Sequence, residues 1–445
     1  MNRYSPLDVA GPLPWDMVRA VPAIMRAPHL FLTDVTRRHG PVATIPMPRT
    51  PVLVLADPDG VRRVLVENAR GYGKSTIQYS ALATVTGAGL LAGDGEVWKQ
   101  HRRTVQPAFH HGSLEDVAAH AVHAARGLVA EADALAPGTP LEVLDATSRA
   151  GLEVVGHTLA AADLSGDAPL LVDAVGRALE LVVRRAASPV PTAWPTPARA
   201  RLAREVAVID EVCARIVERR RTRSVAEPRD VVGLMLAAGM DDRQIRDELV
   251  TFVVAGHETV ASSLTWTLDL LARNPSVLAR VHAELADALG GREPGWSDLG
   301  NLPLLRAVVD ESLRLYPPAW VVTRKALADD VVAGVEVPAG TLVIVCTWAL
   351  HRDPAVWEAP EEFRPDRFLA GTRPPAGSYV PFGAGPRLCI GRDLALVEEV
   401  LVLATLLRGH TVAPAGPPRP VDALVTLRPR GGLPLHVERL APSLP

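Results

Sequence analysis

The chain has 445 residues, of which 48% are hydrophobic and 22% are charged, as is usual for soluble globular proteins. This composition excludes a largely disordered, collagen-like or coiled-coil chain, and the length allows a large buried core. Lys and Arg total 47 against 50 for Asp and Glu, so the overall charge indicates neither nucleic-acid binding nor attraction to an anionic membrane.

The whole chain, residues 1–445, is expected to form a single domain, with residues 1–40 as an N-terminal extension and residues 41–445 as its core. Between residues 41 and 56, short apolar runs are broken by prolines, and Asp57–Gly60 follows with the composition of a turn. This pattern predicts a small sheet. Prolines occur before any apolar run at the N-terminus, so we expect neither a signal peptide nor a membrane anchor.

From about residue 94 to residue 317 the apolar residues recur with a helical period. Within this half, Asp241 and Gln244 have the spacing of a capping box, and the helical pattern then continues without a breaker to Asn274. A helix of this length spans about 46 Å at a rise of 1.5 Å per residue. The run Arg219–Arg223 is interpreted as the cationic end of another helix rather than as a nucleic-acid patch.

The last third of the chain has three kinds of sequence pattern, in order along the chain. Residues 331–337 and 342–346 are rich in β-branched residues and predict strands, whereas residues 354–386 are proline-rich and irregular. A final helix is expected from Arg392 to Arg408, ended by Gly409. The sequence therefore predicts a mainly α fold with a small β region.

Three cysteines share no CxxC or CxxH spacing, which predicts a reducing, cytoplasmic location: Cys213, Cys346 and Cys389. Cys389 stands apart, because it lies in a glycine-bearing segment, Phe382–Gly391, directly before a predicted helix. Glycines allow the backbone to approach a planar ligand closely, and a helix N-terminus favours the thiolate. Such a thiolate can serve as an axial ligand to iron, although a lone cysteine is more often buried and inert.

This segment resembles the haem-thiolate loop of the cytochrome P-450 monooxygenases. The family pattern FxxGxRxCxG is matched in full by five residues: Phe382, Gly385, Arg387, Cys389 and Gly391. Four further family motifs follow one another in the expected order and extend the resemblance over about residues 40 to 440: Trp98 with Arg102, the run 255–259, Glu311 with Arg314, and the run 365–368. The resemblance implies a haem-thiolate fold that binds haem b, with Cys389 as the iron ligand.

The run Ala255-Gly256-His257-Glu258-Thr259 lies in the middle of the long predicted helix. Gly256 lowers helix stability by about 1 kcal/mol relative to alanine, and the Thr259 hydroxyl can bond to the carbonyl of Ala255, so we expect a local opening. Close helix packing is an alternative reason for Gly256 alone. By the resemblance, Ala255 and Gly256 line the haem, the notch admits dioxygen, and Glu258 and Thr259 supply protons during oxygen activation.

The resemblance also implies which residues hold the haem and which hold the fold. Trp98, Arg102, Arg324 and Arg387 are expected to meet the haem propionates, with His101 as a weaker candidate. Phe382 borders the haem in the cysteine loop. Glu311 and Arg314 are spaced for a helical ion pair, and with Arg367 they are expected to form a buried structural network.

Three motifs of other protein classes are each broken by one residue. His257-Glu258 begins an HExxH zinc motif, but Ala261 stands where the second histidine is required. A phosphate loop at Gly71–Ser75 lacks its first glycine, because Asn68 occupies that position, and Leu388 replaces the third glycine of GxGxxG.

The implied function is a monooxygenase that inserts one atom of O2 into a lipophilic terpenoid, polyketide or fatty-acyl substrate of secondary metabolism. Because the resemblance occupies nearly the whole chain, electrons are expected from a separate partner, a ferredoxin or flavodoxin with its reductase. Three alternatives remain open: a haem-thiolate isomerase, dehydratase or peroxide-using enzyme, a non-catalytic haem sensor, and, more distantly, a nucleotide-binding protein. Glu258 and Thr259 count against the first of these, since those reactions need no proton relay to dioxygen.

Overall fold

The computed structural model describes residues 7–47, 50–160, 166–186, 196–222, 228–369 and 374–440. The chain divides into two compact units, each built from segments that are far apart in sequence. Unit 1 comprises Met1–Ser80, Asp310–Cys389 and Val421–Arg428, and unit 2 comprises Ala81–Val309, Ile390–Pro420 and Pro429–Pro445. The expectation of a single domain stays a prediction.

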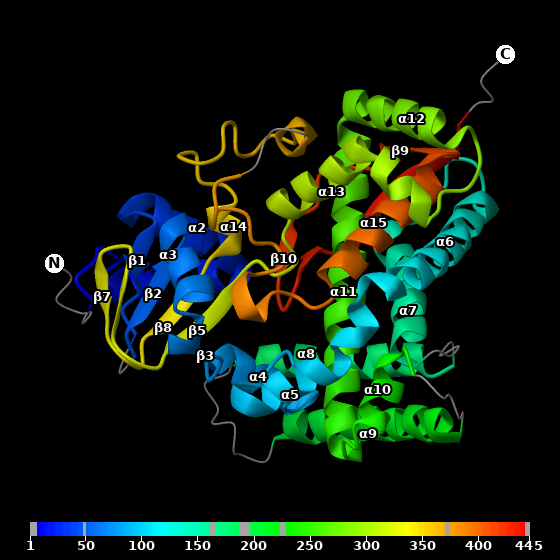
Figure 1. The fold of residues 1–445 in the computed structure, drawn as a ribbon. Helices are drawn as coiled ribbons and strands as arrows, with labels where there is room; N and C mark the ends of the chain where they lie inside the picture. Colours follow the sequence, from blue (N-terminus) through cyan, green and yellow to red (C-terminus); the bar gives the residue numbers. More distant parts are fainter. Residues whose placement is uncertain are drawn as a thin grey trace. The chain divides into compact units, whose positions relative to one another are not determined.

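Unit 1 contains a five-stranded sheet in the order β1-β2-β8-β5-β3 (Figure 1). Strands β2 and β8 are parallel, with Val54 opposite Ile344, and the other neighbouring pairs are antiparallel. All four residues of β2 are buried, which explains why this strand is apolar throughout rather than alternating. The strands are β1 (Val42–Thr44), β2 (Val52–Leu55), β3 (Tyr72–Gly73), β5 (Val322–Ala326) and β8 (Leu342–Val345).

The remaining elements of unit 1 are short. Two further pairs of strands are β6 (Asp330–Val332) with β7 (Val335–Val337) and β10 (Val421–Ala423) with β11 (Leu427–Pro429). The helices are α1 (Pro14–Arg26), α2 (Pro28–His39), α3 (Pro58–Arg62) and α14 (Thr347–Leu350), with a π-helical turn η1 (Arg63–Glu67) and 3-10 turns η2 (Ala69–Gly71), η5 (Pro365–Phe368) and η6 (Gly385–Arg387).

One expectation in this unit is wrong. Asp57–Gly60 does not form a turn between strands but begins helix α3. The Asp57 carboxylate accepts a hydrogen bond from the Gly60 N–H at 2.7 Å, and Pro58 occupies the first helical position. Aspartate followed by proline is therefore a helix start here, because both residues satisfy the first turn of a helix as well as they satisfy a β-turn.

Unit 2 is mainly helical and contains one three-stranded sheet, β4-β12-β9. Its helices are α5 (Gly95–Val105), α6 (His111–Ala134), α7 (Val143–Ala160), α8 (Ala168–Ala186), α9 (Pro197–Thr222), α10 (Val231–Ala237), α11 (Asp242–Arg273), α12 (Pro275–Leu289) and α15 (Arg392–Leu407), with 3-10 turns η3 (Gln106–Phe109) and η4 (Trp296–Asn301). Its strands are β4 (Leu141–Glu142), β9 (His410–Pro414) and β12 (Pro434–Arg439). Helices α4 (Ile77–Thr86) and α13 (Pro303–Leu315) continue from one unit into the other.

Helix α11 is the long helix expected from the sequence, and it packs against α7 and α15 (Figure 1). The Asp241 carboxylate accepts the Gln244 N–H while the Gln244 side chain accepts the Asp241 N–H, which confirms the predicted capping box. At the other end, the side-chain amide of Asn274 donates to the Leu270 carbonyl, and Pro275 begins the next helix. The helix extends over 32 residues, because nothing between these caps interrupts its backbone hydrogen bonds.

The strand expected at residues 342–346 and the last helix from Arg392 are confirmed. The run 331–337 is not one strand but an antiparallel hairpin of β6 and β7, because Ala333 and Gly334 turn the chain with positive φ. Strands β9 and β12 were not expected. They pair over five residues, His410 to Pro414 with Leu435 to Arg439. Among the described residues, no helix is both long enough and apolar enough to cross a membrane.

Candidate functional site

The cysteine loop is a tight turn with two glycines in left-handed conformations. Gly383 has φ +71° and Gly385 has φ +66°, values that L side chains rarely adopt. The Cys389 N–H donates to the Phe382 carbonyl and the Leu388 N–H donates to the Gly385 carbonyl, both at 3.0 Å. These bonds close the loop on itself and bring Phe382 and Cys389 together.

The three cysteines differ in their surroundings. Cys213 and Cys346 are buried, and burial raises the pKa of each thiol to about 12. Cys389 is exposed, three residues before the first turn of α15. Because the thiolate is the form that binds metals, Cys389 fits an iron ligand and the two buried thiols do not.

On α11, residues 255–259 are exposed or half-buried within a stretch that is otherwise buried. The Thr259 hydroxyl donates to the Ala255 carbonyl at 2.5 Å, as expected. The helix nevertheless remains continuous, so the expected local opening does not take the form of a break. A Cβ on Gly256 would lie 2.9 Å from Cγ2 of Val155 on α7, so close packing also requires glycine at this position.

His257 gives no support to a zinc site. Burial lowers its pKa to about 4, and a hydrogen bond with the Ser148 backbone offsets this only in part. No group of three His, Cys, Asp or Glu side chains that could hold a metal ion occurs in the part of the chain that the structure describes. The Gly71–Ser75 segment likewise gives no support to a phosphate loop. Gly73 ends strand β3, and the Lys74 ammonium lies 4.8 Å from the centre of the Tyr79 ring.

Helix α5 holds three of the candidate haem contacts in unit 2. Trp98 is buried, and the Arg102 guanidinium lies 5.6 Å from the centre of its ring. His101 is also buried, and its Nδ1 lies 2.7 Å from a carboxylate oxygen of Glu248 on α11, so one of its two ring nitrogens is already engaged. The other Glu248 oxygen accepts the Leu90 N–H at 3.1 Å.

Glu248 was not among the residues singled out in the sequence. It precedes the run 255–259 by two helical turns, and its partner His101 is 147 residues distant along the chain. No local pattern reveals such a pair.

Unit 1 holds Arg324 and Arg387 together with the cysteine loop. Arg324, on strand β5, is buried, and its Nη1 donates to the Thr323 carbonyl at 2.9 Å and to the Tyr79 hydroxyl at 3.4 Å. Arg387 is the last residue of η6, two residues before Cys389. Within unit 1 the loop thus brings together three of the candidate residues: Phe382, Arg387 and Cys389.

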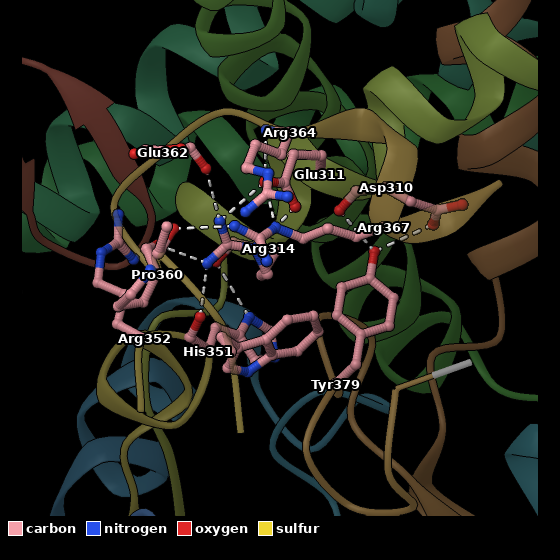
Figure 2. A network of polar contacts seen from close by, with 12 residues as sticks. Asp310, Glu311, Arg314, His351, Arg352, Pro360, Glu362, Arg364, Arg367 and Tyr379 are labelled. Atoms are coloured by element: carbon pink, nitrogen blue, oxygen red, sulfur yellow. Dashed lines mark hydrogen bonds and ion pairs between the residues drawn. The ribbon is translucent and has the colours of Figure 1, made fainter. Parts of the chain in front are cut away.

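The network expected around Glu311 is confirmed (Figure 2). Arg314 and Glu311 form two hydrogen bonds of 2.7 and 2.8 Å, both side chains are fully buried, and Arg367 adds a bond of 3.2 Å to Glu311. Arg314 also donates to three backbone carbonyls, those of His351, Pro360 and Glu362. Every donor of this buried guanidinium therefore has an acceptor.

His351, which the sequence did not single out, extends this network toward the cysteine loop. Its Nδ1 bonds to the Arg314 carbonyl at 3.2 Å, and its Nε2 accepts the Val380 N–H at 2.9 Å, two residues before Phe382. A nitrogen that accepts a hydrogen bond carries no proton, so the ring is neutral. Burial and two neighbouring guanidinium groups lower the pKa of His351 to about 3.

The basic run at the end of α9 is used in ion pairs. Arg220 pairs with the buried Asp230 at 2.9 Å, Arg219 pairs with Asp167, and Arg221 pairs with Asp242. Arg223 lies outside the described residues. These contacts support a structural interpretation of the run rather than a nucleic-acid surface.

Comparison with known proteins agrees with the geometry. A profile of the cytochrome P450 family matches residues 9–435. Over 399 residues, the chain is 33% identical to cyclooctat-9-en-7-ol 5-monooxygenase from Streptomyces melanosporofaciens, covering 86% of this chain and 85% of that protein. Over 418 residues, it is 32% identical to the protein LUTEIN DEFICIENT 5, chloroplastic, from Arabidopsis thaliana, covering 87% and 70%.

The fold has solved counterparts. The crystal structure of the cytochrome P450DA heme domain superposes with a TM-score of 0.84 and 27% sequence identity, over 94% of each chain.

Proposed function

The chain belongs to the cytochrome P450 family, and from this premise we propose which of its residues carry out the work of a monooxygenase. The resemblance inferred from the sequence is confirmed, as is the mainly α fold with a small β region. The protein is a cytochrome P450 monooxygenase that uses haem b. When bound, the haem supplies the redox chemistry that activates dioxygen.

Cys389 is proposed as the residue that holds the iron. The observation that carries this proposal is its exposed thiol in a loop closed by two glycines at positive φ, next to the first turn of α15. A helix N-terminus and nearby N–H groups stabilise a thiolate.

Three cations and an indole are proposed to bind the haem propionates: Arg102, Arg324, Arg387 and Trp98. A guanidinium forms strong, charge-assisted hydrogen bonds with a carboxylate, so each arginine suits this role. The contact between Arg102 and the Trp98 ring limits the freedom of the arginine. His101 remains a candidate through its second nitrogen, with Glu248 fixing the orientation of the ring.

Glu258 and Thr259 are proposed to move protons to the site of oxygen chemistry, beside Ala255 and Gly256. The Thr259 hydroxyl donates to the Ala255 carbonyl, so its lone pairs can accept a hydrogen bond from an acid or from water. Glu258 is half-buried one residue away and is the nearest acid along the helix.

The iron ligand is tested by the spectrum of the reduced, CO-treated protein. The wild type and a Cys213→Ala control are expected to show the red-shifted band of a thiolate-bound haem. Cys389→Ala is expected to lose that band while keeping the fold, as judged by circular dichroism. A Cys389→Ala variant that keeps the band would overturn the proposed function at its centre.

The substrate is proposed to be lipophilic, of terpenoid, polyketide or fatty-acyl type. Phe252 on α11 stacks on Phe109 with ring centres 5.5 Å apart, so this part of unit 2 offers apolar aromatic surface. A similar protein is named for the oxidation of cyclooctat-9-en-7-ol, so that compound is the first ligand to test. A spectral shift on its addition, absent with a charged analogue, would support this class.

Electrons are proposed to come from a ferredoxin or flavodoxin with its reductase. Arg103 on α5 and Arg392 at the start of α15 are exposed, and cations at such positions attract a small acidic protein. Arg392 also pairs with Asp393 at 2.8 Å, which offsets part of its charge. Turnover with NAD(P)H is expected only when the partner is added and is expected to weaken as salt rises. Full turnover without a partner would contradict the proposal.

A further inference from the structure

Asp330, at the start of β6, is a buried carboxylate with an unusual number of donors. Arg63 donates twice to one of its oxygens, at 2.6 and 3.2 Å. The Asn68 amide and the Tyr72 hydroxyl donate to the other at 3.0 and 2.9 Å. Burial alone would raise the pKa of Asp330, but the hydrogen bonds from Arg63, Asn68 and Tyr72 outweigh it and lower the pKa to about 2. The group is therefore charged and fully bonded at neutral pH.

These donors lie at both ends of one short segment. Arg63 is the first residue of the π-helical turn η1, Asn68 directly follows the turn, and Tyr72 begins β3. A π-helical turn is rare, because its geometry is unfavourable without support from outside. The Asp330 carboxylate on β6 therefore binds residues at the beginning and at the end of η1, although it lies more than 250 residues away in sequence.

The turn η1 in turn lies against the cysteine loop within unit 1. A Cβ added to Gly385 would lie 2.0 Å from the Leu65 carbonyl oxygen, so only glycine fits and the two backbones are in direct contact. The Gly385 carbonyl accepts the Leu388 N–H, and the next residue, Cys389, closes the loop on Phe382. The place of η1 thus sets the place of the loop.

We propose that Asp330 is a positioning residue for the Cys389 thiolate. It fixes both ends of η1, and η1 forms the backbone surface on which the turn Gly385–Arg387 rests. This inference depends on the proposed role of Cys389 as iron ligand. Asp330 itself takes no part in the chemistry, since it acts on the thiolate only through η1 and Gly385.

The test compares Asp330→Asn with a matched control, Asp298→Asn. Asp298 is a similar carboxylate in unit 2: its side chain is 3% exposed, against 5% for Asp330, and it pairs with Arg292 and caps Gly295. Each substitution removes the charge but keeps the shape. Both variants should lose some thermal stability, and only Asp330→Asn should affect the cysteine loop.

The first readout is the rate at which the reduced, CO-treated holoenzyme converts from the thiolate band to the band of a protonated thiol in mild urea. Asp330→Asn is expected to convert about five-fold faster than the wild type, and Asp298→Asn within about two-fold of it. Each variant is measured at a temperature that lies the same number of degrees below its own Tm, so that a difference in overall stability does not set the rate. Equal rates in the two variants would overturn the role of Asp330.

The second readout is hydrogen exchange at the Cys389 and Leu388 amides, which needs no enzyme activity. Asp330→Asn is expected to speed exchange at both amides and to leave the amides of α15 unchanged. If the Cys389 amide keeps its protection while Tm falls, Asp330 only supports the fold and the proposal is wrong. Tyr72→Phe, which removes one donor, gives the same test with a smaller change if Asp330→Asn folds poorly.

A third variant tests the route through η1. Gly385→Ala disturbs the contact between the loop and η1 from the loop side. The effects of Gly385→Ala and Asp330→Asn on the rate of band conversion should therefore be less than additive. Full additivity would show that Asp330 acts by another route. If the wild type lacks the thiolate band or Cys389→Ala retains it, the ligand assignment fails and the role of Asp330 toward iron fails with it. A normal wild-type band with unchanged Asp330→Asn conversion would overturn the role of Asp330 alone.

Discussion

The cysteine loop and helix α11 carry the main parts of the proposed site, and different forces hold them in place. The loop has irregular backbone and depends on a few polar contacts, such as the bond from the Val380 N–H to His351. Helix α11 is regular and is held by packing, as at the contact between Gly256 and Val155. The loop should therefore be sensitive to the loss of single polar groups, and the helix to changes of shape.

The largest effect is expected on the loop side of this comparison. Arg314→Ala strands the fully buried carboxylate of Glu311 and removes the donor to three carbonyls. Breaking a buried pair in this way typically destabilises a protein by about 3 to 5 kcal/mol, so we expect little haem-loaded protein. Haem absorbance per mole of purified protein and Tm give the measurement.

The control for Arg314→Ala is Arg439→Ala. Arg439 also forms a bidentate pair, with Asp133, but its side chain is 74% exposed, so solvent replaces the lost contact. Its Tm should stay close to that of the wild type. A well-folded, haem-replete Arg314→Ala variant with normal Tm would show that the network around Glu311 does not hold the fold.

In both regions the sequence predicts the local contacts and misses the distant ones. Spacing was sufficient for the loop motif around Cys389, for the pair Glu311 and Arg314 on one helical face, and for the caps of α11 at Asp241 and Asn274. These signals are local, because a helical turn or a short loop brings together residues that are close in sequence.

The residues that support the site from a distance could not be predicted. Asp330 meets Arg63 across 267 positions, and Glu248 meets His101 across 147. Only the tertiary fold creates such pairs, and an acid inside a helix or strand otherwise has the pattern of an ordinary surface residue. His351 is similar: its role arises because the buried Val380 N–H, 29 positions away, has the histidine ring as its acceptor.

A smaller effect, with a defined pH dependence, is expected for His351→Gln. The folded protein keeps His351 neutral down to about pH 3, whereas a histidine in the unfolded chain binds a proton near pH 6.5. Between these values the unfolded state holds more protons, so stability is complete above pH 6.5 and falls as the pH falls. His351→Gln should lose about 1 to 2 kcal/mol at pH 7, and less at lower pH.

Urea unfolding at pH 7 and pH 5 measures this difference for His351→Gln. Some slope should remain, because burial also lowers the pKa of His257 on α11 to about 4 and that group acts in the same direction. Equal slopes in the wild type and the variant would show that His351 is not the group that titrates.

On the helix side, Gly256→Ala tests shape rather than charge. The new methyl group would lie 2.9 Å from Val155, and overpacking of this kind typically lowers stability by about 1 to 3 kcal/mol, partly offset by the better helix propensity of alanine. We expect a net loss of about 1 kcal/mol by urea unfolding. Gly127→Ala in α6, where a Cβ meets nothing within 4 Å, should instead be neutral or stabilising. A stabilised Gly256→Ala variant would contradict the packing argument.

The smallest effect on stability, and the clearest on coupling, is expected for Thr259→Ala. The variant loses one methyl group and one hydroxyl-to-carbonyl bond on a half-buried face, so its Tm should change little. Without the hydroxyl, protons reach the oxygen site less efficiently, and reducing equivalents should be diverted to hydrogen peroxide. Thr267→Ala is the matched control, since Thr267 makes the same bond to the Ser263 carbonyl at 2.8 Å on a buried part of α11. Product and peroxide formed per NAD(P)H should change in Thr259→Ala, recover in Thr259→Ser and stay normal in Thr267→Ala; unchanged coupling in Thr259→Ala would leave the hydroxyl with a structural role only.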